Sequence, residues 1–305
     1  MVDAGEVFRR AGGSGWCHVR CIDCDRQCGH AATEPVVLAS MVKVPLVLEF
    51  ARQVVAGQLD PTARVRLRAT DRLGGSGTAG CADHVEMSLR DLARFALSIS
   101  DNTAADALFA AVGVANVRSL VREVGLPDTR ILGGPRQVVE SIVGDVSGAD
   151  PARFAADYAG LDEARMRQLR ALDPRHTNAS TGRDLTALLR AVWRDEAAPA
   201  AACATLRGLM ATQLAGHRLA AGFPDEVEVV AKTGTLLAVR AEAGVVSYPD
   251  GGRYAVAVGI RLDRMSGRQP AADRALGTVA RRAVESLRAD CRHPDLPPAV
   301  APDRG

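Results

Sequence analysis

Strand-like segments near both ends of the chain, with a long helical stretch between them, constrain the fold of this sequence more than any other feature. Near the start, residues 16–22 and 27–38 are strand-like and flank a polar turn. Near the end, residues 227–235, 240–248 and 253–262 are strand-like, and the last two flank a Pro-Asp-Gly-Gly turn. We therefore expect both ends to build one antiparallel sheet of roughly five strands.

The middle of the chain reads as helix. Residues 40–57 show an apolar helical pattern that closes on Gly57. Capping pairs and helix-ending glycines follow, namely Ser88 with Asp91, Thr181 with Asp184, Gly113 and Gly125. No strand is predicted between residues 57 and 222, and a last helix is predicted over residues 270–289.

These patterns predict an α/β domain with an inserted all-helical domain. The sheet domain would comprise residues 1–50 and 223–293, and the helical domain residues 51–222, with an active-site cleft where the two meet. The proline-rich residues 294–305 show no periodicity, so a disordered tail is predicted there.

Lysine is rare in this chain. Of 38 basic residues only two are lysine, Lys43 and Lys232, and the others are arginine. An arginine can supply surface charge, but only an ammonium group can give up its proton near neutral pH. The two lysines are therefore candidates for chemistry.

Both lysines fall within short motifs. Ser40 and Lys43 form an S-x-x-K pattern, whose spacing places hydroxyl and amine side by side on a first helical turn. A serine becomes a strong nucleophile when a neighbouring base takes its proton. The other two motifs are Ser100-Asp101-Asn102, at a break between helices, and Lys232-Thr233-Gly234-Thr235, at the end of an apolar strand.

This set of three motifs, in this order, resembles the penicillin-recognising serine enzymes, and among them the class A β-lactamases. The resemblance extends over about residues 5–290, including the order of strands and helices and an Arg-Ala-Glu-Ala-Gly strand after the lysine motif. It implies a β-lactamase/transpeptidase-like fold, with α/β and all-α parts.

The resemblance implies a role for each motif residue. Ser40 would be the acylated nucleophile, with Lys43 as its general base or proton relay. Ser100 would pass a proton to the leaving nitrogen and would be held by Lys232, while Asn102 would bond Lys43 and the substrate amide.

The resemblance also implies a binding strand. Thr233 and Thr235 would bind a substrate carboxylate, Gly234 would permit close approach of a ligand, and the backbone N–H groups of Ser40 and Thr235 would form the oxyanion hole. Arg240 and Glu242 alternate on the next strand, so they share a face. Arg240 would bind an anionic substrate or, alternatively, form a cross-strand ion pair.

One element of the class A pattern is missing. These enzymes carry a glutamate that activates water for deacylation, and its place falls here on Pro135. An insertion over about residues 136–175 follows, from which Glu140 or Glu163 could return to the cleft. Without a replacement, the acyl-enzyme would hydrolyse slowly.

The seven cysteines give no standard metal pattern. Cys17, Cys21, Cys24 and Cys28 are close in sequence, near His18 and His30, but their spacing is not that of a zinc ribbon or finger. In a hairpin Cys21 and Cys28 would lie roughly opposite each other. We expect free thiols, and no metal or cofactor.

The sequence thus predicts a serine acyl-enzyme hydrolase that opens a β-lactam or related amide. The alternatives are an esterase, amidase or transacylase of small-molecule biosynthesis, and a sensor that a β-lactam acylates without turnover. The net charge of 38 − 36 = +2 does not suggest a nucleic-acid partner, so a small, anionic substrate is expected. No secretory signal and no stretch of about 18 apolar residues is seen, which predicts a cytoplasmic protein unless the chain is a trimmed mature form.

Overall fold

The computed structural model describes residues 3–148, 150–265 and 268–291, and the predicted tail over residues 294–305 lies outside them. Its helices are α1 (Ala4–Arg10), α2 (Lys43–Val55), α3 (Leu89–Ser98), α4 (Asn102–Val112), α5 (Val114–Glu123), α6 (Pro135–Ser147), α7 (Pro151–Ala159), α8 (Glu163–Arg167), α9 (Gly182–Trp193), α10 (Ala200–Met210) and α11 (Pro270–Asp290). Its strands are β1 (Gly13–Cys21), β2 (Gln27–His30), β3 (Val36–Val37), β4 (Arg64–Leu67), β5 (Val85–Ser88), β6 (Ala179–Ser180), β7 (Glu228–Leu236), β8 (Val239–Ser247) and β9 (Arg253–Leu262).

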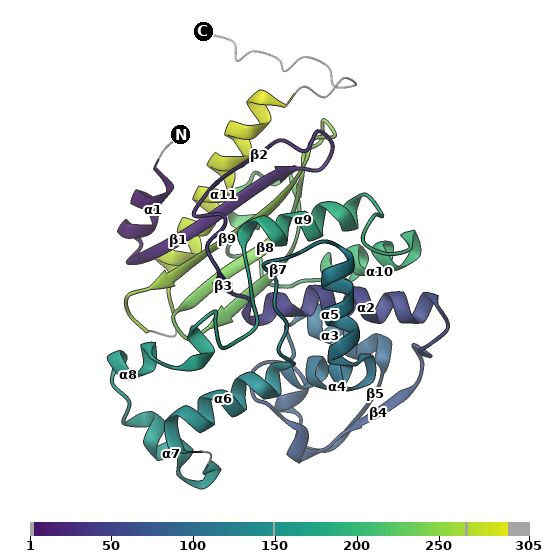
Figure 1. Cartoon of the computed structure of the whole chain (residues 1–305), viewed down its shortest axis with the longest axis vertical. Coiled ribbons are helices and arrows are strands. Elements are labelled where there is room, and N and C mark those ends of the chain that lie inside the picture. Colours follow the sequence, from purple (N-terminus) through teal and green to yellow (C-terminus); the bar gives the residue numbers. More distant parts are fainter. Residues whose placement is uncertain (1–2, 149, 266–267, 292–305) are drawn as a thin grey trace.

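The predicted five-stranded antiparallel sheet is present and joins the two ends of the chain (Figure 1). Its order is β2-β1-β9-β8-β7, so the first strand lies beside the last. Trp16 on β1 is opposite Gly259 on β9, and Thr235 on β7 is opposite Arg240 on β8. Strand β7, which carries the lysine motif, is thereby an edge strand.

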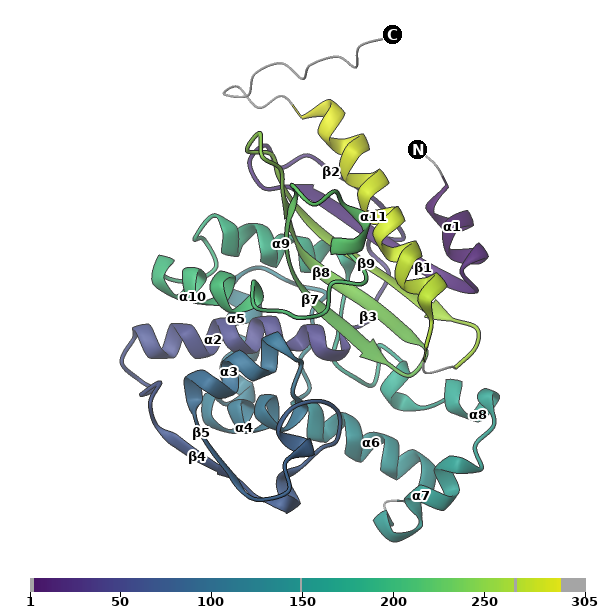
Figure 2. The ribbon, with the colours of Figure 1, turned by 180° about the vertical axis from the view of Figure 1, so that it is seen from behind.

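Helices cover both faces of the sheet. Helix α9 packs on β1, β8 and β9 on one face, and α1 and α11 pack on the other, as Figure 2 shows from behind. Alternating residues of β9 supply the two cores: Ala255 and Ala257 face the helical bundle, while Tyr254, Val256 and Val258 face α11. Apolar residues on both faces explain why these strands read as nearly continuous hydrophobic runs.

The predicted helix boundaries agree with the structure at the caps. The side chains of Ser88 and Thr181 accept the backbone N–H groups of Asp91 and Asp184, at the starts of α3 and α9. Gly113 ends α4 and Gly57 follows α2, both with positive φ. Among the described residues no single helix is long and apolar enough to span a membrane, although the bent pair α4 and α5 passes on length and composition together.

Several strand predictions were wrong. The predicted strand 27–38 is two separate strands, because β2 ends at His30 and β3 pairs with β6 instead. Strands β4 and β5, which pair with each other, and β6 lie within the stretch predicted to lack strands. These strands have two to four residues each, too few to show an alternating pattern. Cys28 lies opposite Val19, not Cys21.

Candidate active site

Ser40 lies on a tight turn between β3 and helix α2. The turn is a 3₁₀ helix over Ala39–Val42, and Ala39 has a positive φ of 46°. Strand β7 packs directly against this turn: a Cβ on Gly234 would stand 3.0 Å from the Leu38 carbonyl oxygen and 3.1 Å from Met41. Gly234 is therefore needed for contact between the strand and the nucleophile turn, whereas the sequence suggested contact with a ligand.

Ser100 lies between the two lysines of the chain. The Lys43 Nζ is 3.3 Å from the Ser100 Oγ, and the Lys232 Nζ is 3.0 Å from the same oxygen. Ser100 has a φ of 60°, a strained conformation for a residue other than glycine. The next residue, Asp101, is fully buried and caps α4 by accepting the Ala104 N–H, which fixes this corner in place. The three predicted motifs thus meet at one hydroxyl group.

Lys43 is fully buried at the start of α2. Its Nζ donates to the Ser100 carbonyl oxygen at 2.7 Å and to the Asn102 Oδ1 at 2.8 Å. Burial, and then the charge of Lys232, lower its pKa well below the ordinary value. Since a lowered pKa lets an amine lose its proton near neutral pH, Lys43 is suited to act as a base.

Lys232 is also fully buried, and its Nζ donates to the Thr233 carbonyl oxygen at 3.0 Å. Burial lowers its pKa to about 7, although the negative charge of Glu242 opposes the shift. Glu242 is itself buried and accepts hydrogen bonds from the Leu219 N–H at 2.7 Å and the Gln213 Nε2 at 2.9 Å. The carboxylate therefore supplies negative charge near Lys232 and anchors the segment that carries Gln213 and Leu219.

Sequence reasoning missed two residues of this site. Arg218 is buried and ion-paired with Asp273 at 2.7 Å, and its Nη2 donates to the Thr235 Oγ1 at 2.9 Å. The Thr233 N–H on the open edge of β7 donates to the Gln213 Oε1 at 2.6 Å. Both residues lie in an irregular segment before β7 that carries no motif, so no pattern in the sequence could indicate them.

Arg240 lies opposite Thr235, as the predicted strand pairing required. Its Nη1 donates to the carbonyl oxygens of Leu237 and Val239 at 2.6 and 3.0 Å, in the turn between β7 and β8. The Thr235 hydroxyl accepts a hydrogen bond from Arg218. The role of Arg240 in substrate binding stays a prediction.

One pocket contains Ser40, Lys43, Asn102 and Thr235. The pocket is also lined by Leu236 and by residues of α6, all of them apolar: Pro135, Val138, Val139 and Ile142. Asn178 lines the pocket too and accepts the Leu132 N–H at 2.7 Å, which holds the chain entering α6. The residues that α6 contributes to this pocket therefore include no carboxylate.

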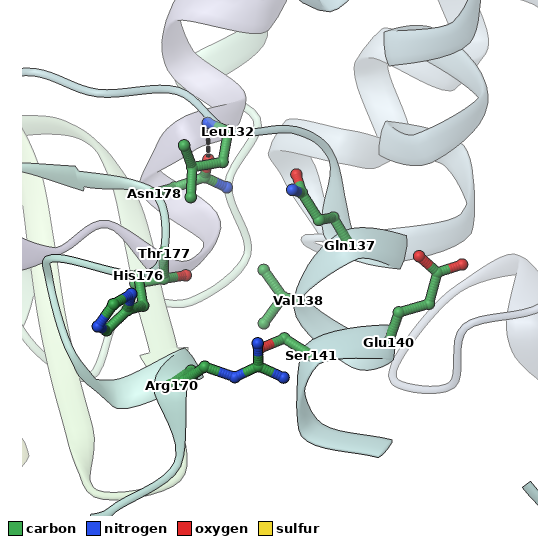
Figure 3. A pocket seen from close by; sticks show the side chains of 9 residues that line it. All are labelled: Leu132, Gln137, Val138, Glu140, Ser141, Arg170, His176, Thr177 and Asn178. Carbon is green, nitrogen blue, oxygen red and sulfur yellow. Dashed lines mark hydrogen bonds between the residues drawn. The ribbon is translucent and has the colours of Figure 1, made fainter. Parts of the chain in front are cut away.

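Neither candidate glutamate from the insertion lines this pocket. Glu163 is exposed on α8 and ion-paired with Arg167 at 3.0 Å. Glu140 is exposed on α6 and lines a neighbouring pocket, where its carboxylate points away from Asn178 (Figure 3). Both glutamates are thus exposed helix residues rather than groups that return to the cleft, and the α6 residues that line the Ser40 pocket are apolar.

Known proteins are similar to this chain in sequence and in fold. A sequence model described as the beta-lactamase enzyme family matches residues 3–287. The beta-lactamase regulatory protein BlaB of Streptomyces cacaoi is 33% identical over 267 residues, which are 82% of this chain and 85% of that protein.

Solved structures agree on the fold. A β-lactamase from Sphaerobacter thermophilus superposes with a TM-score of 0.74 at 24% identity, covering 94% of this chain and 96% of that one. A mutant of PBP-A in an acyl-enzyme complex with penicillin G superposes with a TM-score of 0.71 at 19% identity, covering 93% and 95%. The fold is therefore that of class A β-lactamases. Because the family model spans nearly all of the described residues and the Streptomyces relative matches most of the chain, this protein belongs to the beta-lactamase enzyme family.

Proposed function

We propose that the protein performs serine acyl-enzyme chemistry, in which Ser40 opens a β-lactam or a related amide. The observation that carries the proposal is the hydrogen-bonded cluster of Lys43, Ser100 and Lys232 beside the Ser40 pocket. Burying two amines around one hydroxyl costs free energy, and buried groups with shifted pKa values cluster at functional sites.

In the proposed acylation, the neutral Lys43 amine takes the proton of the Ser40 hydroxyl, and the Ser40 Oγ bonds to the substrate carbonyl carbon. The N–H groups of Ser40 and Thr235 stabilise the oxyanion. As the carbon–nitrogen bond breaks, the Ser100 hydroxyl gives its proton to the leaving nitrogen and regains one from the lysines. The products are an ester on Ser40 and a free amine.

An anionic substrate fits the binding strand. Lys232, Thr235 and Arg218 place two cations and a hydroxyl at the end of β7. A substrate carboxylate, such as that of a penicillin, would bind these three side chains. Their charge and position support the prediction of a small, anionic substrate.

We further propose that the acyl-enzyme is long-lived. The pocket wall formed by Pro135, Val138 and Val139 offers no base to activate water, and the relative in Streptomyces cacaoi is named as a regulatory protein. A sensor that a β-lactam acylates without turnover is therefore the second candidate function. The two candidates share the acylation step and differ in hydrolysis of the ester.

Time-resolved intact mass spectrometry tests both candidates. The protein is mixed with a penicillin and, separately, with an activated ester, and Ser40→Ala serves as the control. We expect a penicillin adduct that clears slowly, and no adduct on Ser40→Ala. Rapid clearing with product formation would favour the β-lactamase. Ester turnover without a penicillin adduct would favour the esterase or transacylase, and labelling of Ser40→Ala would refute the proposal.

A further inference from the structure

Three cysteines outside the Ser40 site gather at the other end of the sheet. Cys21 ends β1, Cys24 lies in the turn to β2, and Cys291 directly follows α11. Their sulfur atoms all lie within 4.8 Å of one another, and those of Cys24 and Cys291 are 3.3 Å apart. Figures 1 and 2 place the turn and the end of α11 at the same end of the molecule.

This cluster is remote from the nucleophile. Across the sheet, Thr235 pairs with Arg240 on β8, Arg240 pairs with Ile260 on β9, and Ile260 pairs with Gly15 on β1. Cys21 is six residues further along that strand, a distance of about 20 Å. The cluster therefore takes no part in the chemistry proposed at Ser40.

We propose that Cys21, Cys24 and Cys291 bind one zinc ion through three thiolates. Tetrahedral zinc–thiolate bonds of about 2.3 Å hold their sulfur atoms about 3.8 Å apart. The Cys24 and Cys291 sulfur atoms, 3.3 Å apart, are closer than this, and all three sulfur atoms lie within 4.8 Å, so small side-chain rotations complete the geometry. Cys21 and Cys24 also have the C-x₂-C spacing typical of zinc ligands.

Burial raises the pKa of the Cys21 and Cys291 thiols, so zinc would displace their protons, and groups near the cluster would then stabilise the thiolates. The Cys24 N–H points at the Cys21 sulfur, 3.5 Å away, and would stabilise negative charge on it. Arg26 donates to the Asp290 carbonyl oxygen at 2.6 Å, which holds its guanidinium group beside Cys291. Three thiolates and one zinc ion carry a net charge of −1, and Arg26 offsets it. Cys24 is exposed, so the fourth zinc position opens to solvent.

The sequence did not indicate this set of ligands. It grouped Cys17 and Cys28 with Cys21 and Cys24, whereas the structure buries Cys17 in the core and directs the Cys28 sulfur to the Ala283 carbonyl oxygen. Cys291 had no pattern, because it is separated from Cys24 by nearly the whole chain. The ion would tie the first hairpin to the end of the last helix, and its binding would release three thiol protons.

Metal titration of the full chain under reducing conditions tests the proposal. Zinc affinity is measured against a chromophoric chelator, and cobalt serves as a spectroscopic probe of tetrahedral thiolate coordination. We expect one ion per chain, with intense thiolate-to-cobalt charge-transfer bands. Cys24→Ser and Cys291→Ser should each lose more than about tenfold in zinc affinity, since even outer partners of a site are worth about 10–100-fold.

Cys81→Ser is the matched control, because Cys81 is a half-buried free thiol outside the cluster. The zinc affinity of this variant should equal that of the wild type. Equal affinity of the wild type and Cys24→Ser would overturn the proposal. So would a reduced protein that binds no metal but forms a Cys24–Cys291 disulfide when an oxidant is added. Ser40→Ala should bind zinc normally, which separates this test from that of the acyl-enzyme.

Discussion

At the scale of single residues, the amines of Lys43 and Lys232 share the hydroxyl of Ser100, and both are buried. Burial favours the neutral amine, so each lysine is a weaker base than in water. The pKa of Lys232 falls to about 7, and its charge therefore changes in the neutral range. An arginine would keep that charge at every pH, which gives a reason for lysine in an arginine-rich chain.

The pH profile of acylation should report Lys232. Its amine is charged below a pKa of about 7 and neutral above it, so the acylation rate by penicillin should fall as pH rises through 7. Lys232→Arg should be slower at neutral pH, by about tenfold or more, but should lack this fall because guanidinium stays protonated. Adduct formation followed by mass spectrometry across this range gives both profiles. The same fall in Lys232→Arg would contradict the assignment.

His18 is a second residue with a displaced pKa, and it lies in the core rather than in the site. Its Nδ1 is 2.6 Å from the Thr186 Oγ1, between β1 and α9. Burial, followed by the charge of Arg183, lowers its pKa from 6.5 to about 4. The folded protein therefore holds His18 neutral under conditions that would protonate it in the unfolded chain.

This difference predicts an acid-sensitive fold. The contribution of His18 to the free energy of unfolding is fully present above pH 6.5. It is lost as pH falls toward about 4, because His18 is then protonated in the unfolded chain but not in the folded one. The slope approaches about 1.4 kcal/mol per pH unit. Urea unfolding at a series of pH values should show this pH dependence of the free energy of unfolding in the wild type but not in His18→Gln. His84 is exposed, so the control variant His84→Gln should keep the pH dependence. Equal slopes in all three proteins would disprove it.

At the scale of elements, helix α6 begins at Pro135, where the sequence resemblance puts the deacylation glutamate of class A β-lactamases. Pro135 is its first residue, after Gly134, and proline fits this position since its missing N–H has no partner there. The next turns send Val138, Val139 and Ile142 toward Ser40. The sequence predicted an insertion here, but the direction of the helix face follows from its packing.

A carboxylate restored at this helix start should speed hydrolysis of the acyl-enzyme. In Pro135→Glu the side chain lines the Ser40 pocket, and the helix N-terminus favours its negative charge. A positioned general base is worth about 10²–10⁴-fold, so deacylation should rise by at least about tenfold. Decay of the penicillin adduct measures it, with Pro135→Gln as the uncharged control. Identical decay in the two variants would show that the missing base does not limit turnover.

The strands that the sequence predicted are long, whereas the strands that it missed are short and depend on a pairing partner. Strands β7, β8 and β9 have nine or ten residues each and were placed to within a few residues. Helix α1 and strands β4, β5 and β6 were missed. Each of these strands has at most four residues, so tertiary pairing rather than local pattern defines it.

At the scale of the whole molecule, the seam between β1 and β9 joins the two ends of the chain. Trp16 on β1 lies across from Gly259 on β9, and a Cβ on Gly259 would stand 2.6 Å from the indole ring. The absence of a side chain at Gly259 thus lets the tryptophan cover the strand. This contact spans nearly the whole sequence and ties the fold together.

An added methyl group at this seam should destabilise the protein. Gly259→Ala forces the Trp16 ring or the strand to shift, and overpacking of this kind costs about 1–3 kcal/mol. Gly208 lies in helix α10, and a Cβ added there would have no atom within 4 Å, so Gly208→Ala should instead stabilise by about 0.5–1 kcal/mol. Denaturant unfolding of both variants gives the comparison. Equal stability of the two would refute the account of the seam.

The sequence by itself determined strands β7, β8 and β9 and the helix caps, since these depend on local periodicity and on neighbours a few residues away. It also carried the three motifs with Ser40, Lys43, Ser100 and Lys232, which were read from a family resemblance. Only the tertiary structure decided that both lysines meet at the Ser100 hydroxyl, that Arg218 touches Thr235, and that Cys291 joins Cys21 and Cys24. Such contacts join residues far apart in the chain. Their partners are set by packing of the sheet and helices, and no local pattern records them.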